Sequence, residues 1–359
     1  MNDMHTDARS AFDAALADAA EGRIDRESAL LILEQSRAPE RALRLFAAAS
    51  AVRDRHLGRA LWWSAGPSAV IPCKIVPRCT YCTFYARHRF TREHLQTAAR
   101  AVAGRGIRYF ILSGGTSLAG YDERLVDMVR TVQAAADLDI FVNLGPSLTE
   151  ETVATLKAMG VAAVTSSLEV HDEAVFASVK PADSLPARKA LLAACERQGM
   201  PIRTMILLGL GETDRQRVEH LFYLRDFRCL SILNVSRYYP YPGVDCAGNR
   251  RCSPWEMARV VALARLLLPA VDIGFGAGHT PDDIPLWFLA GGGNKLVGSV
   301  IAMRSERPAP QPMEEIVALG GNLYEINRMP IIGHYLESLG VAAGFARQTG
   351  GGNAQTRSF

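Results

Sequence analysis

Three cysteines lie close together in the sequence and offer sulfur ligands from one short segment. They stand in CKIVPRCTYC (residues 73–82), a C-x5-C-x2-C spacing. A structural zinc ion usually takes four protein ligands, and no nearby histidine supplies an evident fourth. Three thiolates on one loop suit a cubane iron–sulfur cluster whose fourth iron stays open for a small ligand. We therefore predict that Cys73, Cys79 and Cys82 hold a [4Fe–4S] cluster, with three incidental buried cysteines as the alternative.

The other four of the seven cysteines are scattered along the chain. Cys195 lies in a predicted helix and is expected in the core, because free cysteines often act as small apolar side chains. Cys229, Cys246 and Cys252 stand around a later predicted strand and could contribute to an auxiliary cluster. We leave all four out of the cluster prediction. A disulfide framework is not expected in a long chain in which no secretion signal is visible.

The elements that must position the cysteine segment follow from the hydrophobic pattern. Residues 7–65 are rich in Ala and Leu, with apolar residues three and four apart, which predicts helices. From about residue 68, short apolar runs alternate with longer amphipathic segments. The runs predict strands at 69–75, 109–113, 140–145, 162–167, 203–209, 230–236, 272–278 and 294–299. The segments between them predict helices at 92–104, 122–136, 149–158, 184–198, 214–225, 253–269 and 282–290.

This regular alternation predicts an α/β fold with a parallel sheet. Eight strands fit a (β/α)8 barrel of the TIM type, complete or nearly so, whereas periodicity alone leaves a doubly wound sheet open. We expect an N-terminal helical extension over 1–65, the barrel over 66–305, and a C-terminal helical segment with a flexible tail over 306–359. The cysteine segment follows the first predicted strand. It should therefore lie at the C-terminal mouth of the barrel, where active sites form.

The cysteine segment resembles that of the radical S-adenosylmethionine (SAM) enzymes, in which an aromatic residue, here Tyr81, precedes the last cysteine. The commonest spacing in that superfamily is C-x3-C-x2-C. The longer first gap of this chain resembles that of HmdB, a protein connected with the iron–guanylylpyridinol cofactor of the iron-only hydrogenase. The likeness extends over about residues 25–320 and is closest to the biotin synthase group, which includes HydE, methylornithine synthase and HmdB. VRDRHLGRALWWSAG, RYYPYPGVDC and FLAGGGNKLVG carry it further along the chain.

The resemblance implies a cofactor pair, the [4Fe–4S] cluster and SAM. It places Tyr81 beside the cofactors. Gly114, Gly115 and Thr116, just past the second predicted strand, resemble the glycine-rich turn that meets the amino end of SAM. Glycines at such a turn let backbone amides come close to a ligand, although glycine pairs in α/β proteins are as often simple turns.

Further along the chain, the resemblance implies contacts to the rest of SAM. Glu169 and Arg188 match a Glu and an Arg that contact its methionine part in HydE-like proteins. An arginine fork suits a carboxylate, and a glutamate accepts hydrogen bonds from an ammonium group. Leu208 and Gly209, in LGLGE, resemble the stretch beside the adenine. The same glycines do not make a dinucleotide fingerprint, because Asp214 stands where the third glycine belongs.

The chain departs from biotin synthase inside the barrel. Ile111, Phe141, Arg203 and Gly274 stand at or beside the positions of the three cysteines and the arginine that hold the second, sulfur-donating cluster of that enzyme. A site without thiolates cannot hold that cluster, so biotin synthase activity is not expected. Arg203 is a permanent cation suited to a carboxylate or phosphate on the substrate, or alternatively to a structural ion pair.

The substrate side of the site is less well defined by sequence. Asn143 and Asn234 each stand near the C-terminal end of a predicted strand and are candidates for the barrel mouth. Tyr239, in RYYPYPG, could donate a hydrogen bond into the interior. His279 is the titratable group best placed for a role with the substrate, although a single histidine is more often structural. No catalytic residue is assigned beyond the cluster ligands.

The resemblance implies an enzyme that reductively cleaves SAM to a 5′-deoxyadenosyl radical and abstracts a substrate hydrogen. The longer cysteine gap favours a role in cofactor biosynthesis, as for HmdB. Alternatives are sulfur insertion of the lipoyl synthase type, a non-catalytic iron–sulfur scaffold, and a zinc-stabilised barrel enzyme. The expected partners are a small-molecule substrate or an acyl or peptidyl carrier, and an electron donor such as flavodoxin or ferredoxin.

Composition excludes several other classes of protein. The formal net charge of +3 is too balanced for a protein that mainly coats nucleic acid. Apolar residues make up 48%, which allows a sizeable core. No apolar run reaches the roughly 18 residues that span a bilayer. We therefore expect a cytoplasmic protein that binds neither nucleic acid nor membrane.

Overall fold

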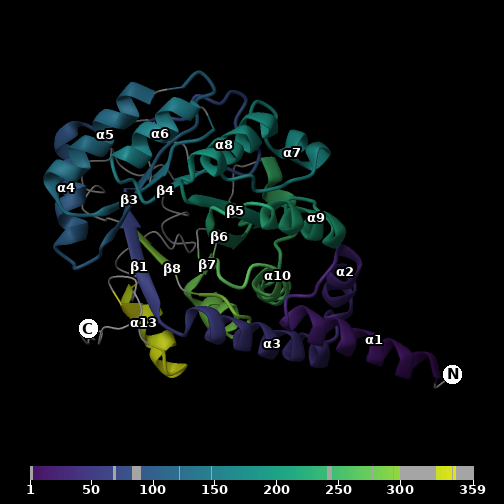
Figure 1. Cartoon of the computed structure of the whole chain (residues 1–359). Helices are drawn as coiled ribbons and strands as arrows, with labels where there is room; N and C mark the ends of the chain where they lie inside the picture. Colours follow the sequence, from purple (N-terminus) through teal and green to yellow (C-terminus); the bar gives the residue numbers. More distant parts are fainter. Residues whose placement is uncertain are drawn as a thin grey trace.

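The computed structural model shows a curled sheet surrounded by helices (Figure 1). None of the helices that it describes is both long and apolar enough to cross a membrane. The description covers residues 3–67, 70–82, 90–120, 122–146, 148–240, 245–275, 279–293, 295–299, 329–341 and 343–344.

The strands of the sheet follow one another around the molecule in the order β7-β6-β5-β4-β3-β2-β1-β8. A doubly wound sheet reverses its order at a switch point, whereas this order runs steadily from β7 to β1, which then pairs with β8 in parallel. The predicted α/β barrel class is therefore confirmed. The strands are β1 (Leu61–Gly66), β2 (Tyr109–Ser113), β3 (Asp139–Asn143), β4 (Ala163–Thr165), β5 (Ile202–Leu208), β6 (Leu230–Arg237), β7 (Asp272–Gly274), β8 (Lys295–Ser299) and the short β9 (Ala343–Gly344) beside β1.

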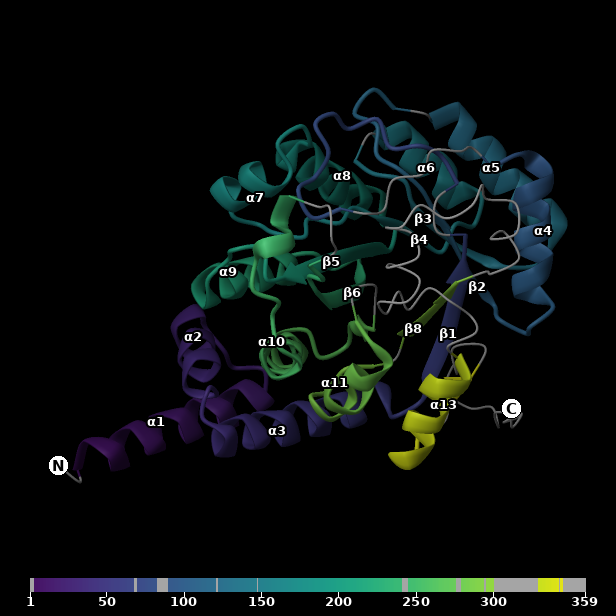
Figure 2. The same ribbon diagram turned by 180° about the vertical axis from the view of Figure 1, so that it is seen from behind.

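Helices cover the outside of the sheet, as Figures 1 and 2 show from opposite sides. Ser and Thr side chains cap the first turns of several of them, so the sequence itself marks where these helices begin. The barrel helices are α4 (Arg92–Ala103), α5 (Asp122–Ala135), α6 (Glu150–Ala158), α7 (Glu173–Val179), α8 (Leu185–Gln198), α9 (Asp214–Arg225), α10 (Pro254–Leu267) and α11 (Ile284–Leu289), with the 3-10 turns η1 (Asp245–Gly248) and η2 (Pro281–Asp283).

The first strand lies earlier than predicted. LWWSAG forms β1, whereas residues 70–75 are a loop that runs past the end of β2. Val70, Ile71 and Ile75 are buried in this loop, which explains why its apolar pattern was misleading. Its backbone is held by the amide of Val70, which donates to Ser113 O at 2.9 Å, and by the carbonyl of Ile71, which accepts from the amide of Gly115 at 2.9 Å.

Apolar side chains from several strands pack together inside the barrel. Trp62, Ile111, Phe141, Ala163 and Ile232, from five different strands, form one buried cluster. The Trp62 ring lies 6.1 Å from that of Phe141, centroid to centroid. The interior at Ile111 and Phe141 is thus filled by apolar side chains.

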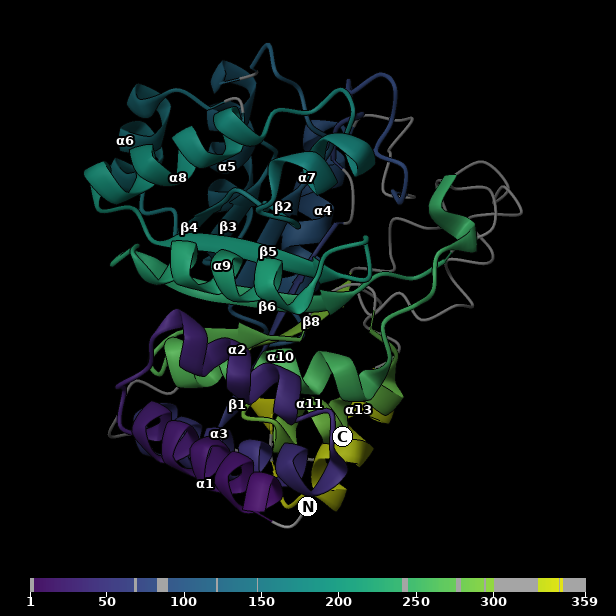
Figure 3. The same ribbon diagram turned by 90° about the vertical axis from the view of Figure 1, so that its right-hand side faces the viewer.

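Three N-terminal helices flank one side of the barrel: α1 (Asp3–Ala20), α2 (Arg26–Gln35) and α3 (Pro39–Leu57). α2 packs against α9, and α3 packs against α10 and α11. Figure 3 shows this layer below the sheet, with α13 (Met329–Ser338) near it.

Two buried arginines tie the base of the barrel to the GGG turn of the FLAGGGNKLVG stretch. Arg265 Nε donates to Gly291 O at 2.9 Å, and its Nη2 donates to Gly293 O at 3.2 Å. Arg53 Nη1 donates to Gly292 O at 3.1 Å. A side chain at Gly292 would collide with the Trp287 ring, 2.4 Å from the added Cβ. The turn therefore requires glycine for packing.

Candidate active site

The three predicted cluster ligands lie on one loop at the C-terminal mouth of the barrel, after β1. Cys73, Cys79 and Cys82 are partly exposed free thiols. Cys82 N donates to Cys79 O at 3.1 Å, which makes a tight turn between these two cysteines. We call residues 73–82 the cysteine loop.

Both glycines after β2 are pressed against the cysteine loop or the segment before it. A Cβ on Gly115 would lie 2.1 Å from Cys73 N, and one on Gly114 would lie 2.8 Å from Ile71 Cγ1. Their amides donate to protein carbonyls, Gly114 N to Asn143 O and Gly115 N to Ile71 O. Thr116 O accepts from Lys74 N at 2.8 Å and lies 3.7 Å from Cys73 Sγ. These residues thus set the position of Cys73.

The other half of the cysteine loop rests on the end of α7. Thr80 N donates to Val179 O at 2.9 Å, and Thr80 Oγ1 lies 2.9 Å from Cys246 Sγ. Burial raises the pKa of the Cys79 thiol to about 12, against the opposing effect of the Lys180 cation. Burial likewise raises the pKa of Tyr81, and the nearby Glu169 carboxylate adds to this effect.

Four charged side chains meet in the interior beside this loop. Lys180 Nζ lies 2.6 Å from Glu169 Oε2 and 3.2 Å from Asp183 Oδ2, and Arg188 Nη2 lies 2.6 Å from Asp183 Oδ2. Each of these side chains is at most 10% exposed. We call Glu169, Lys180, Asp183 and Arg188 the ion quartet; its two carboxylates and two cations balance each other.

The backbone of Glu169 adopts an unusual conformation, from which the side chain reaches Lys180. Its φ is +59°, a left-handed value that non-glycine residues seldom take. The strain is held by an isolated bridge to β5, in which Glu169 N donates to Met205 O and Leu207 N donates to Glu169 O, each at 3.0 Å.

Arg188, on the first turn of α8, is fixed on several sides. Its Nη1 donates to Ser167 O at 2.6 Å, and its Nη2 lies 3.5 Å from Thr116 Oγ1. Burial alone would lower the pKa of Arg188, but the carboxylates of Glu169 and Asp183 outweigh it and raise that pKa. For Asp183, burial acts to raise the pKa, and Lys180 and Arg188 overcome it and lower that pKa to about 2. Asp183 and Arg188 therefore each favour the charged form of the other.

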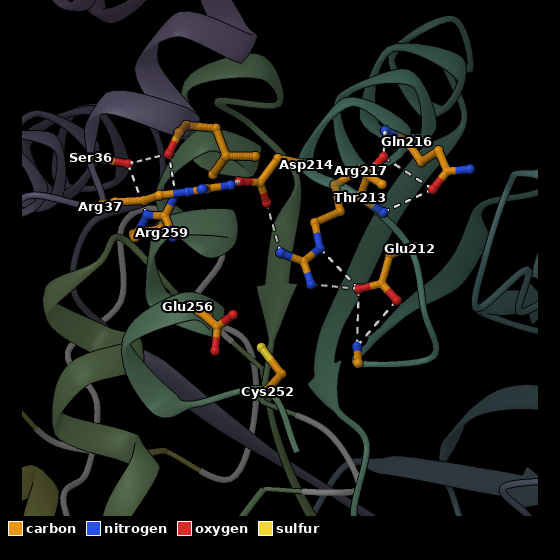
Figure 4. Close-up of polar contacts among 12 residues, drawn as sticks. Ser36, Arg37, Glu212, Thr213, Asp214, Gln216, Arg217, Cys252, Glu256 and Arg259 are labelled. Atoms are coloured by element: carbon orange, nitrogen blue, oxygen red, sulfur yellow. Dashed lines mark hydrogen bonds and ion pairs between the residues drawn. The ribbon is translucent and has the colours of Figure 1, made fainter. Parts of the chain in front are cut away.

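The turn after β5, which holds Leu208 and Gly209, is clamped by a carboxylate. Glu212 accepts from Gly209 N at 3.0 Å and from Leu210 N at 2.8 Å. Arg217 Nη2 donates to the same carboxylate at 2.7 Å (Figure 4). Gly209 has φ +98°, and a Cβ there would lie 3.3 Å from Cys252 N. This turn has a fixed shape before any ligand binds.

Figure 4 also shows how the same clamp reaches the N-terminal helices. Arg217 Nη1 donates to Asp214 Oδ1 at 2.8 Å, and Arg37 Nη2 donates to the other oxygen of Asp214 at 2.8 Å. Arg259 Nε donates to Ser36 Oγ at 3.0 Å. The helical layer thus supports the turn after β5 through a continuous set of charged groups.

Arg203 and two predicted asparagines lie on the interior face of the strands. With the Asn234 amide oxygen facing it, Arg203 donates to Asn234 Oδ1 from Nε and Nη2, at 3.2 Å each. Asn143 Nδ2 donates to Ser113 Oγ at 3.2 Å. Arg203 and Asn234 are 3% exposed. A polar layer therefore stands next to the aromatic layer of the barrel interior.

His279 and Tyr239 lie among other partners. His279 is fully buried, with Nε2 2.7 Å from Val235 O, Nδ1 3.4 Å from Asp283 Oδ2, and its ring stacked on Phe275. The Tyr239 ring lies 4.4 Å from the Arg251 guanidinium. The structure therefore shows these two side chains engaged with protein groups outside the ion quartet.

The remaining four cysteines are free thiols. Cys195 and Cys252 are buried, and burial raises the pKa of each thiol to about 12. Among the described residues, no three His, Cys, Asp or Glu side chains converge closely enough to hold a single metal ion. A cubane does not require such convergence, because each cysteine binds a different iron.

Sequence reasoning missed Lys180 and Asp183. Both belong to KPAD, between α7 and α8, where a lysine and an aspartate three residues apart look like an ordinary polar loop. The available signal was position: the segment joins Glu169 to Arg188, both of which were candidates. The short helix α7 was missed as well.

Comparison with known proteins is consistent with this site. Residues 77–224 match the Radical SAM superfamily, a span that includes Cys79, Cys82 and the whole ion quartet. An uncharacterized protein of Methanocaldococcus jannaschii is 28% identical over 321 residues, which cover 86% of this chain and 82% of that protein. Biotin synthase of Geobacter sulfurreducens is 27% identical over 326 residues, which cover 84% of this chain and 94% of that enzyme.

Solved structures show the same fold. Methylornithine synthase (PylB) superposes with a TM-score of 0.74 at 19% identity, over 92% of this chain and 97% of that one. The FeFe-hydrogenase maturase HydG from Carboxydothermus hydrogenoformans gives 0.78 at 18% identity, over 96% and 82%. The chain therefore carries a match to the radical SAM superfamily over residues 77–224, is similar over most of its length to biotin synthase, and has the fold of methylornithine synthase.

Proposed function

We propose that this enzyme holds a [4Fe–4S] cluster on Cys73, Cys79 and Cys82, cleaves SAM reductively, and abstracts a hydrogen atom from a substrate during assembly of a cofactor of the HmdB type. The observation that carries the proposal is the cysteine loop lying against a buried ion quartet at the barrel mouth. The C-x5-C-x2-C spacing supports the cofactor-assembly role. Such a cluster supplies the electron that breaks a carbon–sulfur bond of SAM.

Other residues of this chain would bind and orient SAM. Arg188, whose Nε and Nη2 hold Asp183, provides a buried permanent charge beside the proposed carboxylate of the methionine part, and Glu169 provides an acceptor for its ammonium group. Tyr81 packs against the apolar cluster that contains Leu207 and Leu210, so it connects the cysteine loop with the turn after β5. A fixed mouth of this kind orients the bound molecule and keeps water from the reacting centre.

The barrel interior favours hydrogen abstraction without sulfur insertion at the biotin synthase positions. Ile111 and Phe141 pack with Trp62 in a closed apolar layer there. Arg203 and Asn234 lie near that layer and suit a substrate that carries a carboxylate or a phosphate. A small molecule or an acyl or peptidyl carrier remains the proposed substrate class.

The outer face of the cysteine loop suits an electron donor. Lys74 and Arg78 are exposed there, and Val76 between them is 81% exposed. Two cations around an apolar side chain fit an acidic carrier such as flavodoxin or ferredoxin, because opposite charge speeds encounter and an apolar centre excludes water.

Anaerobic reconstitution with iron and sulfide tests the proposal. The wild-type protein should take up about four irons per chain and cleave SAM when dithionite is added. Cys79→Ala should lose both properties, whereas the matched control Cys229→Ala, outside the cysteine loop, should keep them. Stoichiometric zinc without iron, or cleavage by Cys79→Ala, would contradict the proposal. About eight irons would favour the sulfur-insertion alternative, and about four irons without SAM cleavage would favour a scaffold.

A further inference from the structure

Lys180 is a buried cation of the ion quartet that was not among the site residues predicted from the sequence. It follows the last residue of α7, and its amide donates to Phe176 O at 2.8 Å, which completes the helix end. Its side chain is 2% exposed. A lysine so far from water must be paired, and Lys180 is paired twice, with Glu169 and with Asp183.

The backbone next to Lys180 is joined directly to the cysteine loop. Val179 O accepts from Thr80 N at 2.9 Å and from Thr80 Oγ1 at 3.3 Å. Thr80 stands beside Cys79, and although burial raises the pKa of the Cys79 thiol, the Lys180 charge acts in the opposite direction. The cation therefore lies within electrostatic reach of a cluster ligand, in an interior where charges are poorly screened.

The charge count of the ion quartet decides what Lys180 contributes. Glu169 and Asp183 bring two negative charges, and Lys180 and Arg188 bring two positive charges, so the quartet is neutral. Arg188 is bound to Asp183 through three hydrogen bonds, of 2.6, 3.0 and 3.1 Å. Lys180 is the cation in direct contact with Glu169, so its removal leaves the quartet with one net negative charge beside the cysteine loop.

We propose that Lys180 is a positioning residue that neutralises Glu169 and thereby raises the reduction potential of the cluster on Cys73, Cys79 and Cys82. Reduction adds one electron to the cluster, and a net negative charge on the quartet nearby would oppose that added charge. The inference rests on the proposed function, because it requires the cluster to be bound. It concerns the cluster before SAM arrives, so it is independent of any contact that Glu169 makes with SAM.

A redox titration of the reconstituted protein without SAM, followed by electron paramagnetic resonance, tests this inference. Lys180→Met should lower the midpoint potential by about 59 mV, the equivalent of a tenfold change in a one-electron equilibrium. Lys180→Arg keeps the charge and should stay near the wild type. Lys157→Met removes an exposed lysine from α6, away from the quartet, and should also stay near the wild type.

A charge-balanced pair separates electrostatics from damage to the fold. Glu169→Gln should raise the potential, and Glu169→Gln combined with Lys180→Met should return it close to the wild-type value. If the Lys180→Met protein takes up no cluster, the test compares the other two variants. The midpoint potential should then be lower in the double variant than in Glu169→Gln. Equal potentials across these variants would overturn the inference while leaving the proposed function intact. Failure of the wild type to take up iron would instead overturn the proposed function.

Discussion

Gly115 lies against the backbone of Cys73 so closely that a side chain there has no room. An added Cβ would be 2.1 Å from Cys73 N and 2.3 Å from Cys73 Cα. Backbone atoms cannot swing aside as a flexible side chain can. The glycine after β2 and the first cysteine are therefore fixed against each other, which links a turn residue to the geometry of the cluster ligands.

Gly115→Ala should displace Cys73 and reduce cluster loading. We expect less than half of the wild-type iron per chain after anaerobic reconstitution, because one ligand of three no longer lies in place. Gly248→Ala is a matched control, since a Cβ at Gly248 meets nothing within 4 Å. The measurement is iron and sulfide content together with the thermal midpoint. Full iron content in Gly115→Ala would show that the loop adapts.

The sequence predicted the parts of this site that depend on local pattern. Short apolar runs located β2 to β8 to within a few residues, because buried parallel strands are apolar throughout. Three cysteines on one loop predict the cluster chemistry, and this stays a prediction. β1 escaped because LWWSAG follows directly on the long helix α3, and the next apolar run was taken for the strand.

Other features depend on contacts that no local pattern records. Lys180 meets Glu169 across 11 residues of chain, through a left-handed residue that sequence does not reveal. The GGG turn is required by Trp287 and by two distant arginines, Arg53 and Arg265. His279 was a candidate for a role with the substrate. In the structure its ring nitrogens lie next to Val235 O and Asp283 Oδ2, contacts that the sequence does not reveal.

Arg265→Met should destabilise the base of the barrel. Arg265 is fully buried and donates to the carbonyls of Pro269, Val271, Gly291 and Gly293. Removal of the guanidinium leaves buried acceptors without their donor, which we expect to cost about 3 kcal/mol in the free energy of unfolding. Denaturant titration measures this cost. The control Arg59→Met removes an exposed arginine with a 3.9 Å ion pair and should change stability by under about 0.5 kcal/mol. Equal stability of the two variants would contradict the prediction.

Stability should fall below neutral pH because of a buried histidine, His220. His220 stacks on His171, and burial, with smaller contributions from His171 and Lys189, lowers the pKa of His220 to about 3. The unfolded value is about 6.5, so between pH 6.5 and 3 the unfolded chain binds the extra proton. The contribution is thus fully present above pH 6.5 and is lost as the pH falls, by up to about 1.4 kcal/mol per pH unit.

His220→Leu should remove much of this pH dependence. His220 Nε2 has no hydrogen-bond partner among the described residues, so the apolar replacement breaks no bond at that atom. The free energy of unfolding, measured at pH 7, 6 and 5, should decline less in the variant than in the wild type. His56→Leu changes an exposed histidine of α3 and should keep the wild-type slope. A slope in His220→Leu equal to that of the wild type would refute this assignment.

Glu212→Ala should weaken SAM binding without removing the cluster. The Glu212 carboxylate accepts from the amides of Gly209 and Leu210 and is held by Arg217, so its loss frees the turn proposed to lie beside the adenine. We expect about a tenfold rise in the SAM dissociation constant. In the variant the turn must become ordered when SAM binds, an entropy cost that the preorganised wild-type turn avoids. Equilibrium dialysis of the reconstituted protein measures it. Glu219→Ala, which breaks an exposed ion pair with Arg26, is the matched control. Unchanged SAM affinity with normal iron content would show that the clamp serves the fold alone.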